Sequence, residues 1–129
     1  MKNKVLFFYL LMLLAHIAHV LEEVLGRFWI LDKLGLGWYL SGNAALFAIP
    51  IALLYGVMQK KRRAFQLSIV YAAFMGLQGI GHNVATIVSG RYHGGFAGGI
   101  TGIAMLLISW PLIRQLRKAM PVKRSGLNI

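Results

Sequence analysis

The chain of 129 residues contains no cysteine, and only three of its side chains are acidic. Without cysteine, neither a disulfide framework nor a thiolate metal site can form, so any bound metal must take nitrogen or oxygen ligands. No repeat, linker or low-complexity segment divides the sequence, and we expect one domain over residues 1–129. Charge is scarce as well, at 13% of the residues. A soluble domain of this size needs more charge to cover its surface, which indicates another class of protein.

Apolar residues dominate the composition, with 58% hydrophobic residues and a mean hydropathy of +0.67. A helix needs ~20 predominantly apolar residues to cross a bilayer core of about 30 Å. Four stretches of this kind lie at about residues 5–25, 41–58, 65–89 and 95–116. We therefore predict an all-α membrane protein that forms a four-helix transmembrane bundle.

The net charge of +11 comes from basic blocks that alternate with the apolar stretches. The blocks on one side of the membrane comprise Lys2, Lys4, Lys60, Lys61, Arg62, Arg63, Arg114, Arg117, Lys118, Lys123 and Arg124. The opposite side carries Arg27, Lys33 and Arg91. By the positive-inside rule, both termini are expected in the cytoplasm. The blocks are interpreted primarily as topology signals, with the binding of anionic lipid head groups as the alternative. The expected partner is membrane lipid and not nucleic acid.

A histidine and two adjacent carboxylates lie at the outer end of the first apolar stretch, as His19, Glu22 and Glu23. An ionisable side chain is costly within a membrane, so it usually faces the protein interior, pairs with a partner or binds an ion. At ~100° per residue, His16, His19 and Glu23 fall on one helix face, within about 60°. Glu22 is expected to point elsewhere, toward a neighbouring helix, a basic partner or the rim.

A second histidine, His82 in the third stretch, is expected at nearly the same depth as His19, within roughly one helical turn. Asn43 and Thr101 bring polar groups from the other two stretches to this level. We predict an outward-facing site with His16, His19, Glu23 and His82 as metal ligands, Glu23, His19 and Glu22 as catalytic groups, and Asn83, Asn43, Thr101, Arg91 and Tyr92 around the substrate. The alternative is that the histidines only form buried hydrogen bonds and the acids mark the helix end.

The spacing His19, Glu22, Glu23 resembles the naming motif of the bacterial HXXEE-domain membrane proteins. The segment from Gly81-His82 to Arg91-Tyr92 is similar to the second polar element of that family, although Gly94 stands where the family usually has a proline. The resemblance covers nearly the whole chain. It implies four spans and a place in the bacterial cytoplasmic (inner) membrane, and it supplies no mechanism.

Two classes of function fit these residues. The first is an intramembrane enzyme acting on a lipid-like substrate, either with a divalent metal (Zn, Fe or Mn) or by metal-free acid-base chemistry. The second is a non-enzymatic module that binds or transports a cation, a proton or a small ligand. A structural membrane subunit is a further alternative, so the sequence leaves enzymatic activity open.

Glycines suggest where helices approach one another closely. Gly94, Gly98 and Gly102 recur at four-residue spacing in the fourth stretch, a pattern typical of tight helix contacts in membranes. They predict either close packing within the bundle or a homodimer through this helix. Gly76, Gly79 and Gly81 thin the third stretch just before His82 and predict either a close helix contact or space for a bound molecule.

The segment from residue 26 to residue 40 contains aromatic side chains around Gly35 and Gly37. We expect a short amphipathic piece at the outer membrane interface, where such residues act as anchors. A lid over the site is the alternative.

Overall fold

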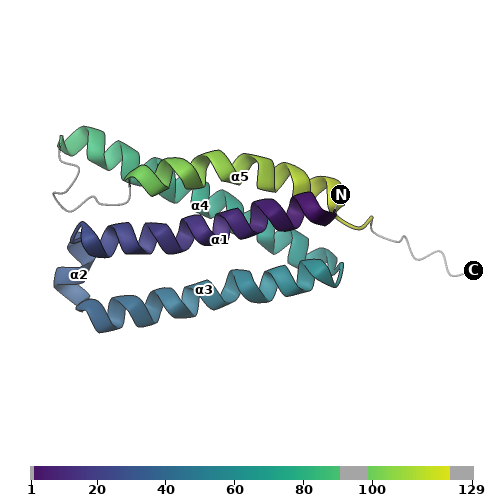
Figure 1. The fold of residues 1–129 in the computed structure, drawn as a ribbon, viewed down its shortest axis with the longest axis horizontal. Helices are drawn as coiled ribbons and strands as arrows, with labels where there is room; N and C mark the ends of the chain where they lie inside the picture. Colours follow the sequence, from purple (N-terminus) through teal and green to yellow (C-terminus); the bar gives the residue numbers. More distant parts are fainter. Residues whose placement is uncertain (1, 91–98, 123–129) are drawn as a thin grey trace, which may run out of the picture.

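The computed structural model describes residues 2–90 and 99–122, and its long helices run along one common axis (Figure 1). In chain order the helices are α1 (Lys2–Leu25), α2 (Trp29–Leu34), α3 (Leu36–Met58), α4 (Arg62–Ser89) and α5 (Gly99–Ala119). All except α2 are long and apolar enough to cross a membrane. The described residues contain no strand, and the predicted all-α bundle of four membrane-spanning helices is confirmed.

The second long helix begins at Leu36, five residues earlier than the sequence predicted. Gly35 adopts a φ of 76°, a left-handed conformation that glycine reaches without strain, and α2 therefore turns directly into α3. The expected interface piece is thus the short α2, while Tyr39 belongs to the first turns of α3. This early start determines where the Tyr39 side chain lies.

Helices α4 and α5 pack backbone to backbone at a glycine pair. A Cβ on Gly79 would collide with the carbonyl oxygen of Gly102, and one on Gly76 would lie 2.7 Å from Ser109 Oγ. Gly81 differs, because a Cβ added there would meet no described atom within 4 Å. Gly102 therefore serves a contact within the chain, as one alternative predicted. Gly94 and Gly98 lie outside the described residues, and the homodimer stays a prediction.

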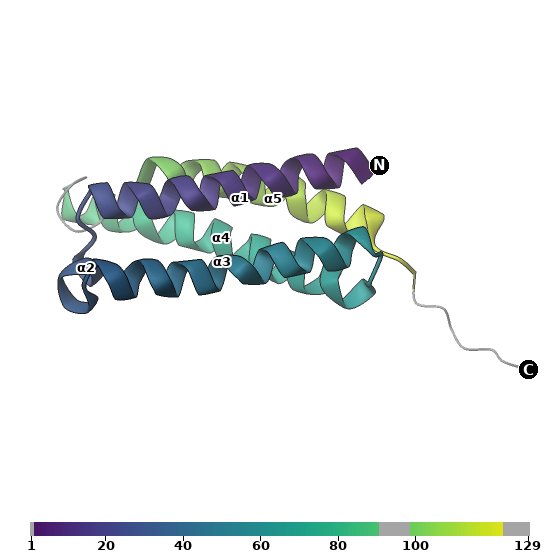
Figure 2. The same cartoon turned by 60° about the horizontal axis from the view of Figure 1, so that its bottom comes forward.

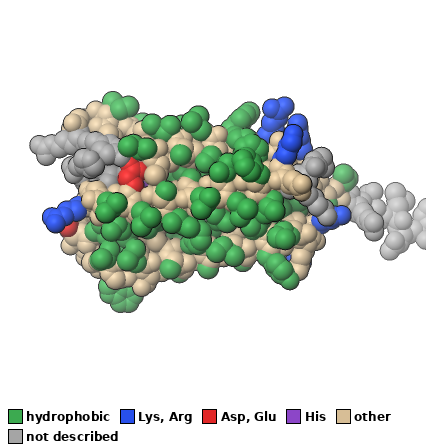
Figure 3. Space-filling view, in the orientation of Figure 1, with side chains coloured by type: hydrophobic (Ala, Val, Ile, Leu, Met, Phe, Trp, Pro, Cys, Tyr) green, Lys and Arg blue, Asp and Glu red, His purple; other side chains and the backbone are tan. Residues whose placement is uncertain are grey.

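The two ends of the bundle differ in their chemistry. At one end, here called the basic end, α1 begins, α3 turns into α4 through residues 59–61, and α5 finishes (Figures 1 and 2). Lys and Arg side chains gather there, whereas apolar side chains cover the flank of the bundle (Figure 3). We call the opposite end, where α2 connects α1 to α3, the α2 end. Which end faces the cytoplasm stays a prediction of the charge distribution.

A buried polar network joins three helices in the half of the bundle nearer the basic end. The Tyr9 hydroxyl donates to the Pro50 carbonyl oxygen at 3.1 Å. It also lies 3.1 Å from Ser68 Oγ, which must be the donor there because the single hydroxyl proton of Tyr9 is already used. Tyr9, Pro50 and Ser68 are fully buried. The network thus satisfies its own hydrogen bonds and ties α1 to α3 and α4.

Candidate metal centre

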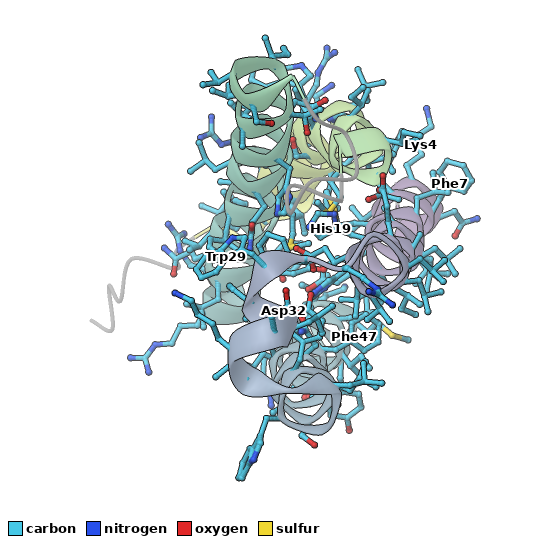
Figure 4. The ribbon with its side chains drawn as sticks, turned by 90° about the vertical axis from the view of Figure 1, so that its left-hand side faces the viewer. Lys4, Phe7, His19, Trp29, Asp32 and Phe47 are labelled. Atoms are coloured by element: carbon cyan, nitrogen blue, oxygen red, sulfur yellow. The ribbon has the colours of Figure 1, made fainter. Side chains whose placement is uncertain are left out.

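Three buried side chains meet near the α2 end: His19 and Glu23 from α1, and His82 from α4. A separation of four residues places His19 and Glu23 on the same helix face, one turn apart. Glu23 Oε1 lies 3.5 Å from His19 Nε2 and 3.2 Å from His82 Nε2. One ligand atom from each residue lies within 4.8 Å of the other two. Figure 4, viewed from the α2 end, shows His19 inside the bundle and Phe7 on its outside.

The distances in this trio fit a small divalent cation. Nitrogen and oxygen atoms bound about 2.0–2.1 Å from a tetrahedral zinc lie roughly 3.3 Å apart, close to the two measured separations. His19 Nε2 is buried and has no hydrogen-bond partner among the described residues. Such an atom is costly unless something else binds it. The His19, Glu23 and His82 group can therefore hold a metal ion.

The orientation of the His19 ring is fixed by Thr101 of α5. Thr101 Oγ1 donates its only proton to Glu22 Oε2 and lies 3.0 Å from His19 Nδ1. Nδ1 must then carry the proton of the second hydrogen bond, and in the neutral ring Nε2 presents a lone pair. Histidines that bind metals are commonly oriented by such a bond from the other ring nitrogen. The tautomer set by Thr101 is thus the one that a metal requires.

Glu22 lies outside the trio and anchors α1 to the start of α5. Its carboxylate accepts hydrogen bonds from the backbone nitrogens of Ile100 at 3.2 Å and Thr101 at 2.9 Å. The first turn of a helix favours an anion because its N–H groups are unpaired and the helix dipole is positive there. Of the partners expected for Glu22, the structure gives it a neighbouring helix. The hydrogen-bonded path from Glu22 to the trio runs through Thr101 to His19.

Tyr39, which the sequence argument does not include, donates its hydroxyl proton to Glu23 Oε2. This bond occupies one carboxylate oxygen and leaves Oε1 for the two histidines. The sequence pattern places Tyr39 among the interface aromatics. The signal that points to its role is its position one helical turn after Gly35, which fixes the start of α3.

His16, expected as a fourth ligand, lies beside the trio and not within it. Its Nδ1 is 3.2 Å from the Tyr71 hydroxyl, and its ring packs edge to face on Phe47. It nevertheless lines the same cavity as His19 and Glu23. The structure thus separates His16 from the three residues that converge.

The other residues predicted around the substrate lie in different places. Asn43 lines the cavity and donates to the Tyr39 carbonyl oxygen at 3.0 Å. Asn83 donates to the carbonyl oxygens of Gly79 at 2.8 Å and Gly99 at 3.0 Å, which joins α4 to the start of α5. Arg91 and Tyr92 lie outside the described residues.

Two cavities flank the trio. One, of about 420 Å³, lies between α1, α3 and α4 and has His16, His19, Glu23 and Asn43 at its polar end. The other, of about 500 Å³, is lined by residues that include Phe28, Trp29 and His82. Phe74 and Gln78 line both cavities and separate them. A molecule in either cavity can therefore approach the trio.

No protein-family model, curated protein or solved structure matches the chain. The resemblance to HXXEE-domain membrane proteins accordingly stays a prediction, and function has to be argued from the site.

Proposed function

We propose that this protein is a small intramembrane enzyme that holds a divalent metal at His19, Glu23 and His82 and acts on a lipid-like molecule. We place it in a bacterial cytoplasmic membrane with its basic end inside, so that the site lies in the outer half. The observation that carries the proposal is the buried lone pair of His19 Nε2, directed at a carboxylate that also faces His82. Two groups with lone pairs stabilise each other only through a cation between them, which is either a metal ion or a proton.

Zinc suits the donor set best. Two histidines and one glutamate leave the fourth tetrahedral position open, as catalytic zinc sites do. The same three residue types also bind iron, and metal analysis of the purified protein distinguishes the two metals. A metal in this position polarises a substrate carbonyl or lowers the pKa of a bound water.

The protein residues around the trio have distinct tasks in this proposal. Glu23 and the two histidines bind the metal, Tyr39 holds the second oxygen of Glu23, and Thr101 holds His19. The apolar walls of the adjoining cavity exclude water and suit an apolar substrate. An enzyme is favoured over a transporter because the trio adjoins a ligand-sized cavity.

The test is the metal content of the detergent-purified protein, measured by mass spectrometry. We expect about one zinc per chain in the native protein and nearly none in His19→Ala and His82→Ala. His16→Ala is the matched control, because it removes a buried histidine from the same helix without touching the trio. Equal zinc in the native chain and His19→Ala, with both folded, would contradict the metal centre.

A metal-free acid-base enzyme is the second candidate, favoured by the chain of contacts from Glu22 through Thr101 to His19. A proton on His19 Nε2 or Glu23 would then take the place of the metal. Vesicles of total bacterial lipid containing the native protein or Glu23→Gln, each with and without a chelator, separate the two mechanisms. Lipid conversion that resists the chelator but is absent in Glu23→Gln identifies acid-base chemistry.

A further inference from the structure

The 420 Å³ cavity has a polarity that runs along the bundle axis. Its residues nearest the α2 end are His19, Glu23 and Asn43, and its walls toward the basic end include Leu53 and Leu67. Along α3, the distance from Asn43 to Leu53 is ~15 Å at 1.5 Å per residue. That is about half the thickness of a bilayer core, and the stretch crosses the middle of α3. Leu53 lies only five residues before the end of α3 at Met58, so the cavity has its polar end in the half of the bundle nearer the α2 end and its apolar end beyond the middle, toward the basic end.

The mouth of this cavity lies between α3 and α4 and faces the membrane. The two helices pack tightly near the basic end, where a Cβ on Gly56 would lie 2.6 Å from that of Ala64. Farther along, Ile49 of α3 and Val70 of α4 line the cavity while 55% and 64% of their surfaces stay exposed. Exposed apolar side chains on membrane-spanning helices face lipid. A water-borne polar molecule would meet only apolar groups at this mouth, whereas an alkyl chain would be stabilised by them.

We propose that the cavity binds a single-chain amphiphile that enters sideways from the bilayer, with a carbonyl or carboxylate head at the metal centre and its chain between α3 and α4. The contact of the head group rests on the proposed metal centre, while the chain site rests on the cavity alone. A volume of about 420 Å³ is near the lower end for ligand pockets, which suits one chain and not the two of a phospholipid. The substrate class is therefore a fatty acid or a simple fatty acyl derivative.

The experiment uses the full chain, zinc-loaded, in a detergent whose molecules carry two chains and so do not imitate the probe. Palmitic acid is titrated in and its adducts are counted by native mass spectrometry. We expect one saturable palmitate per chain, and at least tenfold weaker binding of the alkylamine of equal length, because its cationic head is repelled by the metal. Val70→Trp places a larger side chain in the mouth from α4. It should weaken palmitate binding at least tenfold and leave the zinc in place.

Leu107→Trp is the matched control, because Leu107 lies on the exposed face of α5 and lines none of the described cavities. It should bind palmitate like the native chain. Ile49→Trp, on the opposite side of the mouth, replaces Val70→Trp if that variant fails to fold.

The outcomes separate this inference from the proposed function. The chain site is overturned if palmitate binding is not saturable, or if Val70→Trp and Leu107→Trp bind palmitate equally. The proposed metal centre is not affected by either result. Val70-dependent palmitate binding in a folded protein that takes up no zinc on reconstitution overturns the metal centre and supports the chain site. Equal binding of palmitate and alkylamine to the zinc-loaded chain overturns the placement of the head group.

Discussion

The two buried polar networks of this bundle both link side chains of several helices, but they differ in whether their hydrogen bonds are all satisfied. Toward the basic end, Tyr9, Ser68 and the Pro50 carbonyl satisfy one another, and three helices are joined with no donor left over. Toward the α2 end, Thr101 and Tyr39 satisfy part of their surroundings, but His19 Nε2 has no hydrogen-bond partner in the described part of the chain. A network that serves packing is complete, because an unmet polar group in an apolar interior is costly. The incomplete network is the one whose residues could hold a metal ion.

Of the substitutions considered, one at Glu23 should have the largest effect on the incomplete network. We expect Glu23→Gln to lower bound zinc from about one per chain to nearly none, because the amide lacks the negative charge that offsets the cation. Folding should persist, since the amide oxygen still accepts from Tyr39. Metal analysis and thermal unfolding measure the two effects. Asp32→Asn is the control, because Asp32 is an acid of α2 outside the trio; equal zinc loss there would point to bulk charge and not to the site.

Thr101 offers a finer test of the same network. Thr101→Val keeps the side-chain shape but removes the hydroxyl that links Glu22 to His19. Losing such a support typically weakens metal binding by about 10–100-fold. Competition with a chelator measures the affinity, and Thr101→Ser, which retains the hydroxyl, should bind zinc nearly as well as the native chain. Valine and serine variants of equal affinity would remove Thr101 from the site.

The smallest effect is expected from a substitution in the complete network of Tyr9, Ser68 and the Pro50 carbonyl. Tyr9→Phe removes one buried hydroxyl and should lower the free energy of unfolding by about 1 kcal/mol without changing zinc content. Unfolding in a denaturing detergent measures this loss. Tyr55→Phe, an exposed tyrosine of α3, should leave stability unchanged. Zinc loss in Tyr9→Phe would show that the two networks are coupled.

Much of the fold can be predicted from hydropathy, because each spanning helix satisfies its own backbone and only its length and apolar character decide where it lies. The trio is also within reach, since His19 and Glu23 share a helix face and His82 has a matching depth. His16 shares that face too, but it sits nearly one turn farther from Glu23 than His19 does and contacts Tyr71 instead.

The contacts that Tyr39 and Thr101 make with the trio cannot be predicted from the sequence. Tyr39 reaches Glu23 because α3 begins at Leu36, and this start depends on the backbone of a single glycine, Gly35. The sequence places Thr101 at the right level, but its contact with His19 depends on how closely α5 approaches its neighbours. That approach is set in part by Gly79 and Gly102, whose pairing in space no local pattern specifies.

The position of Glu22 at the start of the last helix has a consequence for how the protein is made. Glu22 and His19 enter the membrane with the first helix synthesised, whereas Ile100 and Thr101 arrive with the final one. Until α5 is in place, the Glu22 carboxylate lacks the two backbone N–H groups that this helix supplies. A chain truncated before α5 would keep His19, Glu23 and His82 but would lack Thr101, the residue that orients the His19 ring.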